Sequence, residues 1–229
     1  MKLIAIGDIH GRDVWKDINF KVFDKVIFIE DYVDSYTHSD WQVYQNLKEI
    51  IELKKENPDK VILLLGNHDI QYFFYPNYRC SGFRESSQYD LTELFLNAKN
   101  CFQIAYQIDN QLFTHAGISR TWFNQHYDSY FKNLKYDDLA IRLNEMCCNE
   151  EGQNVLFQVG KLRGGNEKIG GIVWADKLET QFDYLFGLHQ IVGHTGVGDI
   201  TVFKDHSTDS SITYIDVLGE KEVFFEMTI

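Results

Sequence analysis

Five short segments of the sequence combine carboxylate, imidazole and amide side chains with glycine. In chain order they read GDIHG from residue 7, EDYVDSY from residue 30, GNHD from residue 66, THAG from residue 114 and GHT from residue 193. Such side chains bind hard or borderline divalent cations such as manganese, iron or zinc, rather than metals that prefer thiolates. Two such cations close together clamp the attacking and leaving oxygens of a displacement and lower the pKa of a water between them. The segments therefore indicate a site for divalent metal ions.

The apolar runs before the first three segments predict the strands that position them. Residues 3–6, 25–29 and 61–65 are continuous apolar runs, as expected for strands that are covered on both faces. Between the second and third runs, apolar residues recur at steps of three and four and predict a helix over 40–56. This order predicts a parallel sheet, in which the carboxyl ends of the strands bring their polar segments to one edge.

The pattern changes after residue 100. A hairpin is predicted from runs 102–108 and 111–115 around Asp109-Asn110. Helices over 119–133 and 136–148 are expected to form a cap-like segment near 119–150, followed by a glycine-rich loop over 160–171. The tail predicts short strands at 190–192, 201–203, 212–216 and 223–227. With no linker or repeat in view, residues 1–229 are expected to form a single domain.

The composition of the chain argues against some classes of protein. The 229 residues are 44% hydrophobic, enough for a sizeable core, and the formal net charge is −12. An acidic chain repels phosphate backbones and anionic lipids, so we expect no nucleic-acid or membrane partner. The four cysteines have no metal-finger spacing, and no apolar window is long enough to span a bilayer, so a cytoplasmic location is expected. The oligomeric state is left open.

In their order and spacing, the five segments resemble the signatures of the calcineurin-like metallophosphoesterases, in the branch of the phosphoprotein phosphatases and diadenosine tetraphosphatases. The resemblance covers most of the chain and leaves the helices near 119–150 without a motif. It implies an α/β fold, a layered α-β-β-α sandwich with a dinuclear metal site at the carboxyl ends of the strands.

The resemblance also implies which residues hold the metal ions. Asp8, His10 and Asp31 would bind the first ion, with Asp31 bridging to the second. The second would be completed by Asn67, His115 and His194. Manganese is the first expectation for both ions, with iron and zinc as alternatives.

Two further residues would move a proton. By resemblance, His68 protonates the leaving oxygen and Asp34 orients the His68 ring. Histidine is suited to donating a proton near neutral pH. Taken singly, an aspartate such as Asp69 after a strand is more often a helix cap, and a lone histidine more often packs. The four histidines outside the motifs are interpreted as surface or packing residues: His38, His126, His189 and His206. The aromatic segment 72–75 is expected to pack beneath the site.

The second segment departs from the family pattern, which opens with glycine and ends with Asp-Arg-Gly. Here Glu30 stands at the glycine, and Ser35 stands at the arginine that normally forks onto the phosphate. Another cation must then contact the substrate, in addition to Asn67. Arg163, in a glycine-rich loop, is the first candidate and Arg84 the second, with Arg79 behind them.

Three functions remain open at this point. The leading expectation is a metal-dependent phosphomonoester hydrolase similar to the serine/threonine protein phosphatases, in which an activated water attacks phosphate in line. Its substrate would be a phosphorylated protein or a small phosphorylated molecule. The alternatives are a hydrolase of diadenosine polyphosphates or another phosphoanhydride, and a metal-binding protein with little turnover.

Overall fold

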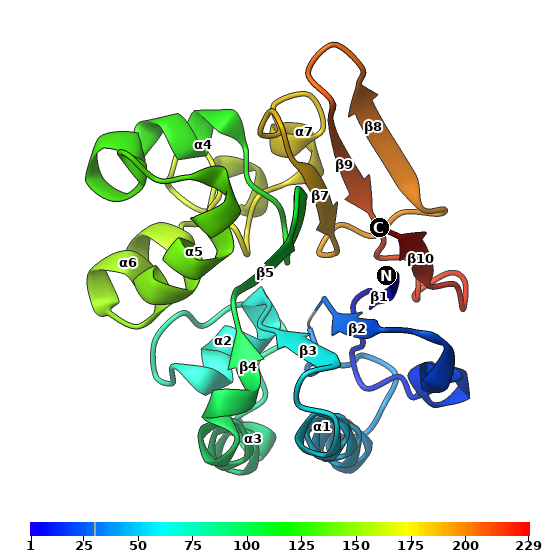
Figure 1. Cartoon of the computed structure of the whole chain (residues 1–229). Coiled ribbons are helices and arrows are strands. Elements are labelled where there is room, and N and C mark those ends of the chain that lie inside the picture. The colour runs from blue at the N-terminus through cyan, green and yellow to red at the C-terminus, as the bar shows by residue number, and fades with distance from the viewer. Residues whose placement is uncertain (30) are drawn as a thin grey trace. The chain divides into compact units, whose positions relative to one another are not determined.

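The computed structural model describes residues 1–29 and 31–229, so Glu30, predicted to replace a family glycine, lies outside the described residues. The chain divides into two units (Figure 1). The first unit comprises Met1–Gln103 and Val217–Ile229, and the second comprises Ile104–Asp216. Each unit contains one five-stranded sheet and its own helices, which confirms the predicted mixed α/β class.

The sheet of the first unit has the strand order β10-β1-β2-β3-β4. Its strands are β1 (Lys2–Ile6), β2 (Lys25–Phe28), β3 (Val61–Leu64), β4 (Phe102–Gln103) and β10 (Phe225–Thr228). β1 to β4 run parallel, with Ile4 beside Val26 and Val26 beside Val61, and β10 pairs antiparallel with β1. The three predicted apolar strands are therefore confirmed, and their carboxyl ends lie at one edge of the sheet.

Three α-helices belong to the first unit: α1 (Asp40–Glu56), α2 (Asn67–Phe73) and α3 (Glu85–Asn97). Short 3-10 turns are η1 (Val14–Asp17), η2 (Phe20–Val22) and η3 (Lys99–Cys101). α1 has the bounds that the sequence predicts, because Ser39 and Gln42 form a capping box at its start. Its apolar face packs against β3 and α3, which lies beside it in Figure 1. α2 begins directly at the GNHD segment and was not predicted.

The sheet of the second unit has the order β5-β6-β7-β9-β8. Its strands are β5 (Ala105–Ile108), β6 (Gln111–Thr114), β7 (His189–Val192), β8 (Thr201–Asp205) and β9 (Ser210–Tyr214). β6, β7 and β9 run parallel, and β5 and β8 pair antiparallel at the two edges. The hairpin at Asp109-Asn110 is confirmed. The prediction of one strand over 102–108 was wrong, because β4 belongs to the first sheet and β5 to the second.

The helices of the second unit are shorter than predicted. They are α4 (Arg120–Gln125), a π-helical turn η4 (Tyr127–Phe131), η5 (Tyr136–Asp138), α5 (Leu139–Cys147), α6 (Glu150–Leu156), η6 (Lys161–Arg163) and α7 (Lys177–Thr180). α5 packs on the edge strand β5, where the Asn144 amide bonds the backbone of Ile104 and Ala105 at 2.8 to 3.2 Å. Trp122, Phe131 and Leu143 are buried, so these helices carry an apolar core of their own. Among the described helices, none combines the length and the apolar content that a bilayer-spanning segment requires.

Candidate metal centre

The loop after β1 places Asp8 and His10 against the loop after β2. The His10 N–H donates to the Asp31 carbonyl at 2.6 Å, and the Gly11 N–H donates to the Tyr32 carbonyl at 3.1 Å. Gly11 has φ +79°, and a Cβ there would lie 2.8 Å from a methyl of Val43, so only glycine fits. The two loops are thus joined through their backbones, and this fixes where their side chains point.

His10 is oriented for binding a metal through one ring nitrogen. Its Nδ1–H donates to the Val33 carbonyl at 2.8 Å, which leaves Nε2 as the acceptor nitrogen, 3.9 Å from Asp31 Oδ2. Burial lowers the pKa of His10, although the Asp31 carboxylate opposes this, so the ring favours the neutral form that a metal needs.

Asp8, His10 and Asp31 converge as a ligand set. One ligand atom from each of the three lies within 4.8 Å of the other two. Asp8 and Asp31 are each 2% exposed, and two buried carboxylates this close would repel each other without a cation. Two carboxylates with a neutral imidazole suit manganese, iron or zinc. The residues therefore fit a divalent ion.

The turn from β3 into α2 brings Asn67 and His68 to the same edge of the sheet. Asn67 is buried, and the His68 N–H donates to Asp31 Oδ1 at 2.9 Å. Asp69 accepts from the Gly66 and Tyr32 N–H groups, both at 3.0 Å, and so ties this turn to the loop after β2. Burial and, next, the charge of Asp31 raise the pKa of Asp69. Asp69 was expected to be the N-cap when taken singly, but Gly66 is the N-cap of α2 and Asp69 stands at the third helical position, where it accepts from the Gly66 N–H.

His68, which follows Asn67, forms a pair with Asp34, which lies three residues after Asp31. His68 Nδ1 lies 2.9 Å from Asp34 Oδ2, and Asp34 is 4% exposed. Burial alone lowers the pKa of His68, but the carboxylates of Asp31 and Asp34 together raise it to about 9. The imidazole is therefore protonated at neutral pH in the metal-free chain, with Nε2–H available to donate.

Asp34 has two further partners that sequence reasoning missed. Gln71 Nε2 donates to Asp34 Oδ2, and the Tyr72 hydroxyl donates to Oδ1 at 2.6 Å. Gln71 and Tyr72 lie three and four residues after His68, so they share its face of α2. That spacing is a usable signal once α2 is recognised. Of the segment 72–75 that was expected to pack beneath the site, Tyr72 is fully buried beneath the pair, whereas Tyr75 is 43% exposed.

Backbone strain concentrates at the predicted site residues. Among the described residues, eight that are not glycine have positive φ, and four of these are predicted site residues: His10 (44°), Asp31 (46°), Asp34 (60°) and His194 (62°). Residues other than glycine adopt this conformation at a cost, and such strain clusters at functional sites. The strain is an observation independent of side-chain chemistry, and half of the residues that show it are predicted site residues.

The second unit holds the other two predicted ligands together. His115 follows β6 and His194 follows β7, and His194 Nδ1 lies 2.9 Å from His115 Nε2. Imidazole nitrogens are common ligands of divalent ions, and two that converge this closely would be able to hold the same ion. The buried Gln190 amide bonds both backbone groups of Ile118, at 2.7 and 3.0 Å, and fixes the loop after His115.

The predicted substrate arginine of the second unit is already engaged. Arg163 Nε lies 2.8 Å from Asp176 Oδ2, and its Nη2 donates to Thr195 Oγ1 at 2.6 Å. Arg163 therefore lies beside the residue that follows His194. The loop is a packed 3-10 turn rather than a flexible one, because a Cβ on Gly165 would lie 2.0 Å from the Val159 carbonyl oxygen.

Ser35, at the position of the family arginine, has a structural role in the first unit. Ser35 is 3% exposed, and its hydroxyl accepts from the Thr37 and His38 N–H groups at 3.2 and 3.0 Å. It stabilises a turn. The Arg84 guanidinium bonds the Ser35 carbonyl and the Asp40 carboxylate.

The Arg79 side chain contacts residues near it in the sequence. Its guanidinium lies 4.0 Å from the centre of the Phe83 ring and 3.6 Å from the Glu85 carboxylate. Because half of this side chain is exposed, the ion pair contributes little. Arg79 is a packing residue of the loop before α3.

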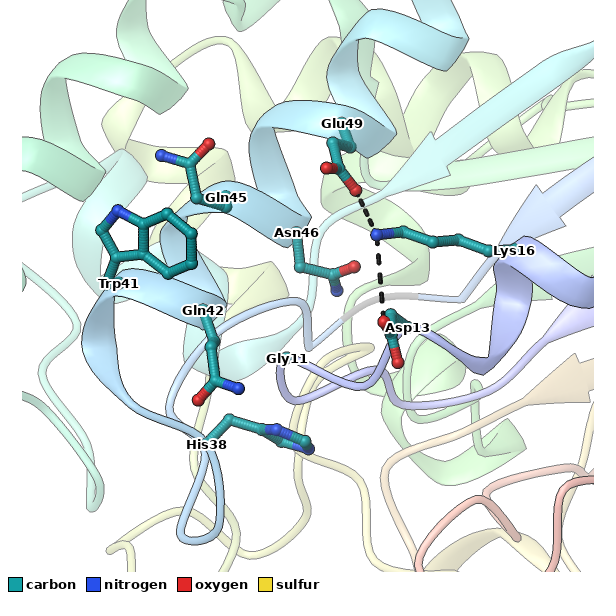
Figure 2. Close-up of a pocket in the computed structure, with 9 residues that line it drawn as sticks. All are labelled: Gly11, Asp13, Lys16, His38, Trp41, Gln42, Gln45, Asn46 and Glu49. Carbon is teal, nitrogen blue, oxygen red and sulfur yellow. Dashed lines mark ion pairs between the residues drawn. The ribbon is translucent and has the colours of Figure 1, made fainter.

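A cavity of about 280 Å³ lies in the first unit between the loop after β1 and helix α1 (Figure 2). Gly11, which follows His10, lines one side, and the first turns of α1 line the other. Lys16 pairs with Glu49, and its Nζ lies 3.9 Å from Asp13 Oδ2. These three cavity residues, one ammonium and two carboxylates, together carry a net negative charge.

The comparisons with known proteins agree with a phosphoesterase. The family described as calcineurin-like phosphoesterase matches residues 1–198, so the chain belongs to that family, whose members are metal-dependent phosphoester hydrolases. A search of curated proteins finds no significant match.

The matches among solved structures include two phosphatases. A cold-active protein-tyrosine phosphatase from a psychrophilic Shewanella species has a TM-score of 0.51 at 16% identity, covering 94% of this chain and 70% of its own. A protein serine/threonine phosphatase from Saccharomyces cerevisiae has a TM-score of 0.49 at 14% identity, covering 93% and 67%. The first of these shows that the fold is shared.

Proposed function

We propose that this phosphoesterase hydrolyses phosphomonoesters, on phosphorylated proteins or small phosphorylated molecules, with two divalent ions. By family membership we assign Asp8, His10 and Asp31 to the first ion, with Asp31 shared. The second ion is assigned Asn67, His115 and His194. Manganese is the proposed metal. The single observation that supports hydrolysis most is the His68–Asp34 pair, because a protein that only stored metal would have no use for an imidazole that a buried carboxylate orients next to the proposed ligands.

The chain's own residues account for the proton in this reaction. When bound, the ions supply Lewis acidity that activates water and offsets the charge of the phosphate. The oxygen of the departing alcohol must gain a proton as its bond to phosphorus breaks. His68 donates that proton from Nε2, because Nδ1 is held by Asp34 at 2.9 Å. The products are the free alcohol and inorganic phosphate, and His68 regains its proton from water.

The charges of the first unit favour a monoester over a polyphosphate. The cavity that Gly11 lines carries Asp13 and Glu49 against one lysine (Figure 2). Arg84 is neutralised by Asp40. A dinucleoside polyphosphate brings several further negative charges, and these residues would repel them. We therefore rank diadenosine polyphosphates below phosphomonoesters.

In place of the family arginine we propose Arg163 as the first contact to the phosphate, with Arg84 second and Asn67 as a further contact. Arg163 presents a planar fork, and its Nη2 bond to Thr195 keeps it next to the GHT segment. The four cysteines are free thiols, which supports a reducing, cytoplasmic location as part of the same proposal.

A substrate panel with added manganese tests the proposal. The panel contains p-nitrophenyl phosphate, a phosphoserine peptide and diadenosine tetraphosphate, and His68→Asn serves as the matched control. We expect hydrolysis of the two monoesters, at least tenfold above diadenosine tetraphosphate in kcat/KM. Preferred cleavage of diadenosine tetraphosphate would establish the anhydride reaction instead. Full metal loading with no turnover on any of the three would establish a metal-binding protein.

A further inference from the structure

The carboxylate of Asp34 is held at both of its oxygens. Oδ2 accepts from His68 Nδ1 at 2.9 Å and from Gln71 Nε2, and Oδ1 accepts from the Tyr72 hydroxyl at 2.6 Å. Gln71 and Tyr72 are completely buried, so water cannot substitute for either donor. A carboxylate bonded on both sides cannot rotate, and neither can the imidazole that it holds.

The two donors are themselves fixed by the backbone of the loop over residues 80–84. The Cys80 N–H donates to Gln71 Oε1 at 3.0 Å, and the Arg84 N–H donates to the Tyr72 hydroxyl oxygen at 2.9 Å. Because a backbone N–H can only donate, the Gln71 amide must present its NH₂ to Asp34, and the Tyr72 hydroxyl must send its own hydrogen there. Two parallel hydrogen-bond chains therefore run from this loop to the two oxygens of Asp34.

Aromatic packing anchors the loop in that position. The Phe83 ring stacks on Tyr72, with centroids 5.1 Å apart at 15°, and on Tyr75, at 6.0 Å and 8°. Stacked rings of this kind contribute about 0.5–1.5 kcal/mol beyond their buried area. The loop is consequently ordered next to His68.

We propose that Gln71 and Tyr72 are positioning residues for the His68 proton donor, and that the loop over residues 80–84 fixes both. The proposal rests on the proposed function, in which His68 protonates the leaving oxygen. Losing either donor frees one side of the Asp34 carboxylate and allows His68 to leave its reactive orientation. A misplaced proton donor slows only reactions that need the proton, so the loss must depend on the leaving group.

The test uses Tyr72→Phe and Gln71→Met, each in the parent and in His68→Asn, with manganese saturating. Substrates are an alkyl phosphate, whose leaving group needs a proton, and p-nitrophenyl phosphate, whose leaving group does not. We expect each variant to lose about tenfold in kcat on the alkyl phosphate, with KM unchanged and a smaller loss on p-nitrophenyl phosphate. In the His68→Asn background neither substitution should lower kcat further, because the residues act through His68.

A matched control removes a buried hydroxyl elsewhere. Tyr214 is 1% exposed, and its hydroxyl lies 2.7 Å from Thr180 Oγ1 in the second unit. Tyr214→Phe should leave the ratio of the two substrate rates at the parent value. Elemental analysis should show parent metal content in all of these variants.

Two results would overturn the proposal in distinguishable ways. If Tyr72→Phe and Gln71→Met slow both substrates equally, or still slow the enzyme in the His68→Asn background, these residues have a structural role only. If His68→Asn itself shows no dependence on the leaving group, the proton donor of the proposed function is wrong and the positioning role fails with it. Leaving-group-dependent losses that disappear in His68→Asn support both.

Discussion

Gly82 lies in the loop between α2 and α3 with φ +84°, directly against the His68–Asp34 pair. A Cβ at this position would lie 3.2 Å from Asp34 Cβ, 3.3 Å from His68 Cε1 and 3.4 Å from His68 Nδ1. The two shortest of these contacts are tighter than ordinary van der Waals separations between carbon atoms. In Gly82→Ala, the imidazole and the carboxylate must therefore yield by a few tenths of an ångström.

The expected loss of activity follows from that displacement. A misplacement of 1 Å at a reacting group can cost about a hundredfold in rate, so a few tenths of an ångström should cost about three- to tenfold in kcat. Alanine at positive φ also strains the backbone, by about 1–2 kcal/mol. Stability alone cannot separate the two effects.

Gly187 provides the control, because alanine there would also have a positive φ but its Cβ would not contact another residue. Its φ is +73°, and a Cβ there would have no heavy atom within 4 Å. Gly187→Ala should lose about 1–2 kcal/mol of unfolding free energy in urea but keep the parent kcat. Gly82→Ala should lose a similar free energy and also the kcat on an alkyl phosphate.

Two outcomes would refute this reasoning. If Gly82→Ala retains the parent kcat, the His68 ring is not displaced by the contact, and the loop does not constrain it. If Gly187→Ala loses the same activity as Gly82→Ala, general strain rather than contact with His68 explains the loss.

Four further outcomes are expected. Asp31→Asn should lower the metal content measured by elemental analysis, and parent content would contradict its role as a ligand. In the metal-free protein, the folded pKa of His68 of about 9 exceeds its ordinary value of 6.5, so its stabilisation is complete below pH 6.5 and is lost as pH rises through 9. The stability difference between parent and His68→Asn should shrink over that interval in urea titrations, and a constant difference would contradict it. Arg163→Ala should lose about ten- to a hundredfold in kcat/KM, and Arg163→Lys should recover little because lysine has no planar fork; an unchanged kcat/KM would exclude the phosphate contact. Gln190→Leu should destabilise the fold by about 2–4 kcal/mol, since it leaves both backbone groups of Ile118 buried without a partner; a loss below 1 kcal/mol would show that another group replaces the amide.

The sequence determined the local elements and the residues at their ends. Continuous apolar runs predicted β1, β2 and β3, and the spacing of apolar residues predicted α1 with its observed bounds. The candidate ligands of the first unit could be read from the sequence because each follows a strand directly. Their convergence then follows from parallel topology alone.

Other features depend on residues far apart in the sequence. The strand predicted over 102–108 divides between two sheets, because Phe102 pairs with Leu63 while Ala105 pairs with Thr114. Ser35 and Arg84, separated by 49 residues, share a hydrogen bond that no local pattern indicates.

The partners of Asp34 are the clearest case of what only tertiary structure decided. The GNHD segment predicts His68, but the roles of Gln71 and Tyr72 appear only when α2 and the loop over residues 80–84 enclose the carboxylate. Strand and helix periodicity record which faces of an element are buried, whereas a hydrogen bond requires two groups within about 3 Å at a particular angle. Chain folding supplies that distance and angle. The sequence therefore indicated the proton donor His68, but not the hydrogen bonds from Gln71 and Tyr72 that orient its partner Asp34.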